Sequence, residues 1–345
     1  MSDSALLALS LPEAISALAS PDALEQFSHL TGAALLVVDL SDDLQRPSAE
    51  PDVAALAIAR TNLEQLPCPT VALGAGKRPS EVVPWAQSFD IVLEDDAELP
   101  AIAKNILANP IASLAMVQLL RQNETLSIHQ GLIAESQVYS MLQGGPEFAA
   151  WLQNRKRPKV AEPNDEPAVS LLRDVSRLHI TLNRPERRNA FSAEMRDGLT
   201  EALQVVLIDA SIEEVILRGA GPAFCSGGDL AEFGTLPDPA TAHVIRSTRN
   251  PARLLARCAD RVRTELQGAC IGAGIELPAF TTRVDAKPGT YFWLPEVSMG
   301  LIPGAGGTVS LPRRIGRQRT NYFALSQRRI DAETALRWGL IDGML

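Results

Sequence analysis

The chain has 345 residues, of which 46% are apolar and 21% charged, and its formal net charge is −9 at pH 7. This composition is typical of a globular protein and excludes a mostly disordered chain, which would have fewer apolar residues and more net charge per residue. The acidic balance also excludes the basic surface that nucleic-acid binding needs.

The cysteines show no pattern of a metal site or a disulfide framework. None of them forms a CxxC pair, and only four histidines accompany the four cysteines. We therefore expect no metal site and a reducing, cytoplasmic environment. The N-terminus lacks the basic region of a signal peptide, and no apolar run reaches the ~18 residues of a membrane span, so no membrane partner is expected.

The first half of the chain predicts an α/β unit followed by a helical tail. Helical spacing near the N-terminus precedes a short apolar run, AALLVVDL over 33–40, which predicts a buried strand. The remaining predicted elements are a helix over 53–66, short strands over 70–73 and 91–93, helices from 99 to 152, and a last helix in PEFAAWLQNR (146–155).

A charged stretch with three prolines, RKRPKVAEPNDEP over 155–167, separates the two halves. Its composition is typical of an exposed linker. We therefore divide the chain into a first domain over 1–157, a linker over 158–167 and a second domain over 168–345.

The second half alternates strands and helices, which predicts a largely parallel sheet with helices on its faces. The predicted elements are strands over 175–182, 214–218 and 263–268, helices over 193–209 and 250–258, glycine-rich loops between them, and a helix that begins near Ala273.

Two glycine-rich motifs follow predicted strands, where α/β folds place ligands. In GPAFCSGGDL (221–230), a free N–H at Ser226 would face an anion; the alternative is an ordinary turn. In GACIGAGIE (268–276), Ala273 N–H would be the donor at a helix start, with Glu276 one turn further; the alternative is tight helix–sheet packing.

A third motif, YFWLPEVSMGLIPGAGGT (291–308), places Glu296 among apolar residues that would raise its pKa and make it a usable acid. The alternative is a solvated glutamate at a strand end. Two N–H donors and two glutamates at glycine-rich turns together fit the stabilisation of an enolate while a proton moves.

With these three motifs, the second half resembles the enoyl-CoA hydratase/isomerase (crotonase) superfamily. The matching stretches are LHITLNRPERRNAFSAEM (178–195), FCSGGDL (224–230), GACIGAGIEL (268–277), PEVSMGLIPGAGGT (295–308) and RRIDAETALRWGLID (328–342). The resemblance covers about half the chain. It implies an α/β, crotonase-like fold of ββα repeats, with mostly parallel sheets, flanking helices and a helical lid.

The resemblance also assigns roles to single residues. Ser226 and Ala273 match the two backbone donors of the family's thioester oxyanion hole, and Glu276 and Glu296 match the catalytic glutamates of the hydratases. The expected coenzyme A contacts are Arg187, Asn189, Ala190, Gly227, Asp229 and Trp151. Coenzyme A enters as part of the substrate, so no separate cofactor is implied.

The family normally continues past 328–342 into helices that cover the acyl-CoA and build a trimer. In this chain, helices of that kind are predicted over 99–155 instead. We interpret the first half as a degenerate, shortened copy that keeps the helical lid and lacks catalytic glutamates; the alternative is an unrelated α/β domain with a helical tail. We expect the lid to pack over the second half, with Trp151 near the coenzyme A groove.

The resemblance implies an enzyme acting on an acyl-CoA, first of all a hydro-lyase that adds water to a 2-enoyl-CoA. Glu276 would activate the water and Glu296 would move the α-carbon proton. The alternatives are an isomerase that uses Glu296 as its main base, or a catalytically silent acyl-CoA-binding subunit. A homo-oligomer, trimeric or hexameric, is also implied.

Overall fold

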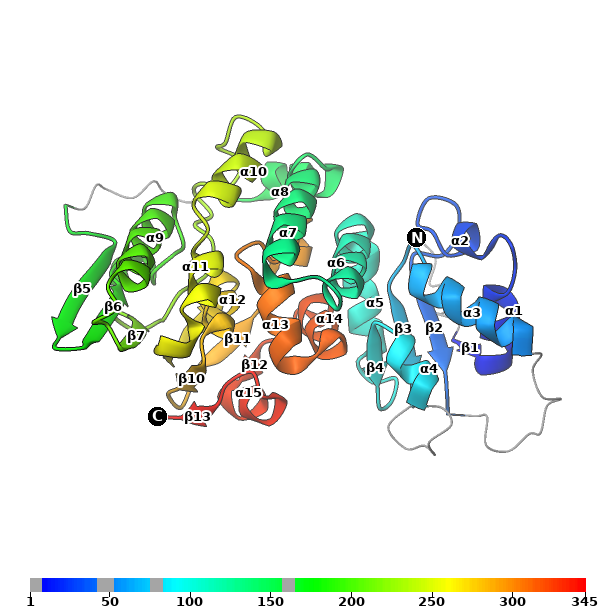
Figure 1. Ribbon diagram of the computed structural model, residues 1–345. Coiled ribbons are helices and arrows are strands. Elements are labelled where there is room, and N and C mark those ends of the chain that lie inside the picture. Colours follow the sequence, from blue (N-terminus) through cyan, green and yellow to red (C-terminus); the bar gives the residue numbers. More distant parts are fainter. Residues whose placement is uncertain (1–7, 42–52, 75–82, 157–164) are drawn as a thin grey trace.

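The computed structural model describes residues 8–41, 53–74, 83–156 and 165–345, which form three sheets surrounded by helices (Figure 1). The first half contains one parallel sheet in the order β1-β2-β3-β4. Its elements are β1 (Leu9–Ser10), α1 (Leu11–Leu18), α2 (Ala23–Gln26), β2 (Leu36–Asp39), α3 (Val53–Gln65), β3 (Thr70–Leu73), α4 (Val83–Ser88) and β4 (Ile91–Leu93). The strands predicted over 70–73 and 91–93 are confirmed, and the strand predicted over 33–40 is shortened to β2.

Both faces of this sheet are covered, which explains the continuous apolar run in β2. Leu36 and Val38 lie in one apolar cluster with Leu18 of α1 and Leu63 of α3. Val37 belongs to the other cluster, which continues into the second half of the chain. Because successive side chains of a strand point to opposite faces, each must be apolar when both faces are buried.

Four helices, which we call the helical cover, follow this sheet: α5 (Leu99–Ala108), α6 (Pro110–Asn123), α7 (Ile128–Gln143) and α8 (Pro146–Asn154). Local sequence sets where they begin. Both α6 and α8 start at a proline, and Ser127 caps α7 in a capping box with Gln130. Glu147 of α8 accepts hydrogen bonds from the Ile111 and Ala112 N–H groups, at 2.8 and 2.9 Å, and so ties α8 to the start of α6.

The second half contains a six-stranded sheet in the order β13-β10-β8-β7-β6-β5 and a three-stranded sheet in the order β12-β11-β9. The strands are β5 (Val169–Asp174), β6 (Arg177–Leu182), β7 (Glu214–Gly219), β8 (Val262–Leu266), β9 (Ala269–Ile271), β10 (Arg283–Ala286), β11 (Tyr291–Trp293), β12 (Ile330–Asp331) and β13 (Gly343–Met344). The single strand predicted over 175–182 is wrong at its start, because Val175, with φ 53°, turns the chain between antiparallel β5 and β6.

Helices flank these sheets on the second half. They are α9 (Ala193–Ile208), α10 (Pro239–Thr248), α11 (Pro251–Arg257), α12 (Ala273–Glu276), α13 (Gly307–Ile315), α14 (Arg317–Ser326) and α15 (Ala332–Trp338), with short 3₁₀ turns η3 (Pro185–Arg187), η4 (Ala259–Arg261), η5 (Pro278–Phe280) and η6 (Glu296–Met299). This is the α/β crotonase-like arrangement, with mostly parallel sheets and flanking helices, that the resemblance implies.

The helical cover packs against the second half within the same chain (Figure 1). Helices α6 and α7 contact α13, α7 also contacts α10 and α11, and α5 and α6 contact α14. Asn123 of α6 donates to the Thr308 carbonyl oxygen at 2.9 Å, and Asn105 of α5 donates to the Ser326 carbonyl oxygen at 3.0 Å. The predicted contact between residues 99–155 and the second half is therefore present.

Asp90 joins the first half to the rest of the molecule. Its fully buried carboxylate accepts from Arg121 of α6 at 2.5 Å and from Arg317 of α14 at 3.1 Å, and from the Thr70 hydroxyl at 2.9 Å.

The described first half has one sheet where the second half has two, so its origin as a shortened copy stays a prediction beside the alternative of an unrelated α/β domain. Within the described ranges, no helix is both long and apolar enough to cross a membrane.

Candidate active site

Glu276 and Glu296 meet because each follows one of two paired strands. Strands β9 and β11 run parallel, with Ile271 opposite Trp293, so the residues after both strands reach the same edge of the small sheet. A Cβ built on Gly272 would lie 2.4 Å from Glu296 Oε1 and 3.5 Å from Glu276 Oε1. Gly272, with φ 49°, therefore gives both carboxyl groups their room.

The two carboxyl groups differ in their hydrogen bonds. Glu276 is 2% exposed, and its Oε2 accepts from the N–H groups of Ala305 and Gly307 at 2.7 and 2.9 Å. Glu296 Oε2 is buried and has no hydrogen-bond partner in the described part of the chain. The first carboxyl group is thus held in place by the backbone, whereas one oxygen of the second is left unpaired among the described residues.

Burial makes both groups weak acids. Burial raises the pKa of Glu296 to about 8, and the charge of Glu135 acts in the same direction. Burial also raises the pKa of Glu276 well above its usual value, with further increases from the charges of Glu296 and Glu135. A carboxyl group with a pKa of about 8, such as that of Glu296, can both give and take protons near physiological pH.

A pocket of about 180 Å³ opens onto this pair of glutamates. Ala273 and Gly228 line it with them, and within the described residues neither N–H has a hydrogen-bond acceptor. The prediction that the Ser226 N–H is free is wrong, because it donates to the Arg188 carbonyl oxygen at 3.0 Å. The donor pair that the pocket presents is therefore Gly228 and Ala273.

Several residues expected to contact coenzyme A have structural roles instead. Asn189 is fully buried and donates to the Ala220 and Ala223 carbonyl oxygens, both at 2.9 Å. Asp229 is buried in an ion pair with Arg187 at 2.7 Å. The expectation that Asn189 and Asp229 bind coenzyme A directly is therefore wrong, because protein groups occupy their polar atoms.

Three more residues expected to contact coenzyme A are Gly227, Arg187 and Ala190. Gly227 is buried, and a Cβ there would lie 3.2 Å from the Ile271 carbonyl oxygen. Gly227 therefore lies where its backbone comes close to that of Ile271. Arg187 and Ala190 are half-buried on the loop after β6, and their contact with coenzyme A stays a prediction.

Trp151 of the helical cover belongs to an aromatic cluster beside the pocket. Its ring stacks on Phe148 at 5.8 Å and packs against Phe233 at 5.9 Å. Phe233 also lines the glutamate pocket and comes close to Gly228, and both Phe148 and Phe233 line the adjoining cavity of about 320 Å³. Trp151 thus lies behind this wall, and its contact with coenzyme A stays a prediction.

Sequence reasoning missed a third glutamate at this site, the buried Glu135 of α7. It accepts from the N–H groups of Gly306 and Thr308 at 2.7 and 2.9 Å and from the Thr308 hydroxyl at 2.6 Å. Successive N–H groups before and at the start of α13 thus alternate between Glu276 and Glu135. The helical cover therefore supplies half of the acceptors that hold the loop beside the active-site glutamates.

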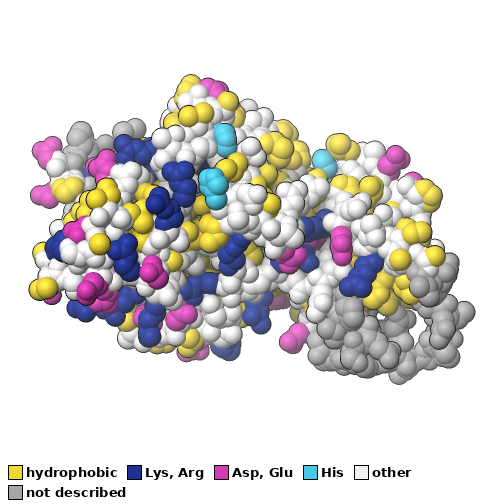
Figure 2. Space-filling model, viewed as in Figure 1, with side chains coloured by type: hydrophobic (Ala, Val, Ile, Leu, Met, Phe, Trp, Pro, Cys, Tyr) yellow, Lys and Arg dark blue, Asp and Glu magenta, His cyan; other side chains and the backbone are white. Residues whose placement is uncertain are grey.

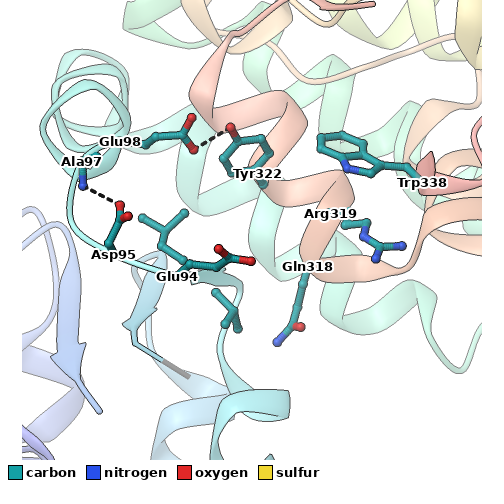
Figure 3. Close-up of a pocket in the computed structure, with 10 residues that line it drawn as sticks. Glu94, Asp95, Ala97, Glu98, Gln318, Arg319, Tyr322 and Trp338 are labelled. Carbon is teal, nitrogen blue, oxygen red and sulfur yellow. Dashed lines mark hydrogen bonds between the residues drawn. The ribbon is translucent and has the colours of Figure 1, made fainter. Parts of the chain in front are cut away.

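A larger cavity, of about 700 Å³, lies away from these glutamates, between the end of β4 and helices α14 and α15 (Figure 3). Two of its polar groups pair with protein atoms: the Tyr322 hydroxyl donates to Glu98 at 2.7 Å, and Asp95 accepts from the Ala97 N–H at 3.0 Å. It contains no pair of buried titratable groups. Across the described residues there is also no cluster of side chains that would hold a metal ion.

Comparisons with known proteins identify the family of the second half. A family model described as enoyl-CoA hydratase/isomerase matches residues 175–345. A 1,2-epoxyphenylacetyl-CoA isomerase of Escherichia coli (strain K12) is 39% identical over 166 residues, 47% of this chain and 63% of that protein. An enoyl-CoA isomerase/hydratase of Mycosarcoma maydis is 33% identical over 173 residues, 48% of this chain and 63% of that protein.

The chain therefore spans less than two thirds of the length of these curated relatives. Among solved structures, an enoyl-CoA hydratase/isomerase from Mycobacterium paratuberculosis matches with a TM-score of 0.49 and 28% identity, over 52% of this chain and 73% of that one. Through residues 175–345, the chain belongs to the enoyl-CoA hydratase/isomerase (crotonase) family.

Proposed function

We propose that this protein is an acyl-CoA enzyme that adds water to a 2-enoyl-CoA or removes it. The observation that carries the proposal is the pair of buried Glu276 and half-buried Glu296 in one pocket with the N–H groups of Gly228 and Ala273, which have no acceptor among the described residues. The two N–H groups would stabilise the enolate oxygen of the thioester, and each such donor typically contributes ~2.7–4 kcal/mol. The glutamates would hold the attacking water between them.

The hydrogen bonds suggest how the two glutamates divide the work. Glu276, fixed by two backbone donors, would orient and activate the water. Glu296, with its unpaired Oε2 and a pKa raised to about 8 by burial, would deliver the proton to the α-carbon. An isomerase is the second candidate, because Glu296, whose Oε2 has no hydrogen-bond partner among the described residues, could by itself move a proton between two carbon atoms.

Hydration of crotonyl-CoA, followed by the absorbance of its conjugated thioester, tests the proposal. Glu276→Gln and Glu296→Gln should each lower kcat by ~10²-fold or more, because each removes a general acid or base. Affinity for a CoA ester should change little. Wild-type hydration by Glu276→Gln with complete loss in Glu296→Gln would favour the isomerase, and CoA-ester binding without turnover by the wild type would favour a silent binding subunit.

A further inference from the structure

Arg246 of α10 lines the glutamate pocket. Its side chain lines that pocket and the two cavities that adjoin it, of about 320 and 50 Å³. Its guanidinium lies over the ring of Tyr139, 4.7 Å from the ring centre, and Tyr139 lines the glutamate pocket as well. The cation is thus fixed in orientation within reach of a molecule bound beside Glu276 and Glu296.

The hydrogen-bond partners of Arg246 are all neutral. Nε donates to the Ser136 hydroxyl at 3.1 Å, Nη1 to Gln143 at 3.3 Å, and Nη2 to the Ser140 hydroxyl at 2.5 Å and the Ser136 carbonyl oxygen at 3.4 Å. A guanidinium has five N–H groups, so these contacts leave one on Nη1. No carboxylate in the described residues forms an ion pair with it.

Two neighbouring arginines, unlike Arg246, form ion pairs with carboxylates. Arg196 and Arg249 line the smallest of these cavities together with Arg246, on a face where Figure 2 shows basic side chains gathered near α9 and α10. Arg196 pairs with Asp197 at 2.9 Å, and Arg249 pairs with Glu201 at 3.3 Å. Within the described chain, Arg246 is the member of this group that forms no ion pair, although the charge of Glu135 acts on it without direct contact.

A half-buried cation without a direct ion pair is costly, because its neutral partners replace water only in part. The acidic groups that share these cavities with it have other partners or a raised pKa. Glu232 accepts from the Ala193 N–H at 2.8 Å. Glu135 is bonded to the α13 loop, and burial raises the pKa of Glu296 to about 8. A carboxylate brought by the bound molecule would complete the site through a charge-assisted hydrogen bond.

We propose that the acyl pocket selects a short acyl-CoA whose acyl chain ends in a carboxylate, and that Arg246 binds this carboxylate. The inference rests on the proposed function, because it takes the thioester to lie against Gly228 and Ala273. The same small pocket contains the glutamates and Arg246. The terminal carboxylate of the acyl chain must therefore lie only a few carbon atoms from the thioester.

Binding of two saturated esters, glutaryl-CoA and valeryl-CoA, tests this without any turnover. They have the same chain length, and only glutaryl-CoA carries the terminal carboxylate. The wild type should bind glutaryl-CoA about tenfold or more tightly than valeryl-CoA, as expected for one hydrogen bond to a charged group. Arg246→Met should lose that preference and keep its affinity for valeryl-CoA, and Arg246→Lys should retain part of the preference.

Arg249→Met is the matched control, because it removes a neighbouring arginine that already has a partner, and it should leave both affinities unchanged. Equal wild-type affinities for the two esters would overturn the inference. So would an Arg246→Met variant that folds, by circular dichroism, and binds both esters equally more weakly. If Arg246→Met does not fold, the wild-type preference and Arg246→Lys decide.

The two proposals fail separately. Hydration of crotonyl-CoA without a preference for glutaryl-CoA would remove the role of Arg246 and leave the proposed function. A preference for glutaryl-CoA without hydration of any enoyl-CoA would remove the hydratase and leave the role of Arg246. Failure to bind either ester would overturn both.

Discussion

Glu135 offers the sharpest test of how the helical cover supports the active site. Glu135→Ala would leave three donors of the α13 loop, the N–H groups of Gly306 and Thr308 and the Thr308 hydroxyl, without their acceptor in a buried place. A buried polar group without a partner costs about 1–3 kcal/mol. We therefore expect the free energy of unfolding to fall by at least about 3 kcal/mol.

The same change should lower activity, because the loop that Glu135 holds also donates two hydrogen bonds to Glu276. Urea unfolding measures the stability, and crotonyl-CoA hydration measures kcat. Glu135→Gln keeps the volume and one acceptor oxygen, so its loss should be smaller. Gln137→Ala, at an exposed position on the same helix, is the control and should change neither quantity. A loss below about 1 kcal/mol in Glu135→Ala would refute the reasoning.

Three further predictions follow from other contacts. Gly272→Ala should lower kcat at least ~10-fold and destabilise the protein by about 1–3 kcal/mol. The reason is that φ of Gly272 is 49° and the added Cβ would lie 2.4 Å from Glu296 Oε1. Unchanged kinetics would show that the two glutamates tolerate displacement. The pKa of Glu296 is raised to about 8 from 4.5, so the folded state keeps a proton that the unfolded state releases, and the free energy of unfolding should fall as pH rises between these values. Glu296→Gln should weaken this slope in urea titrations at pH 5, 6.5 and 8, and an unchanged slope would assign it to other groups. Residues 168–345 expressed alone should be insoluble or inactive, because the apolar face under the helical cover would be exposed, and residues 1–160 supplied in trans should restore activity; a soluble, fully active fragment would contradict this.

The glutamate pair could be predicted from the sequence because each member belongs to a local motif that follows its own strand. Glu276 and Glu296 needed only the pairing of β9 with β11 to meet. The donor on the first glycine-rich loop could not be predicted in this way. The direction of an N–H depends on which residues pair, and here Gly228 pairs with Phe191, while Cys225 pairs with Cys270. These pairings turn the Ser226 N–H toward Arg188 and leave the Gly228 N–H without an acceptor in the part of the chain that the structure describes.

Residues of the helical cover were harder to assign for a different reason. Glu135 stands in a helix with no motif around it, and its role arises from a contact with a loop far along the chain. For Asn189 the error is the opposite one. We predicted contact with coenzyme A because this polar residue lies in a loop expected to line the ligand groove. Its amide instead donates to two carbonyl oxygens of the protein and so holds two loops together. Sequence patterns report local structure, whereas satisfaction of a polar group depends on the whole fold.

The order of the elements along the chain has a consequence for synthesis on the ribosome. The helical cover ends at residue 154, but α10, α11, α13 and α14, which it contacts, lie between residues 239 and 326. At about 5–20 residues per second, the cover is complete roughly 10–30 s before these partners have been made. During this interval its apolar face has only the sheet of the first half to contact. We expect nascent chains to spend this interval exposed to chaperones, and slower translation between residues 155 and 250 would lengthen it.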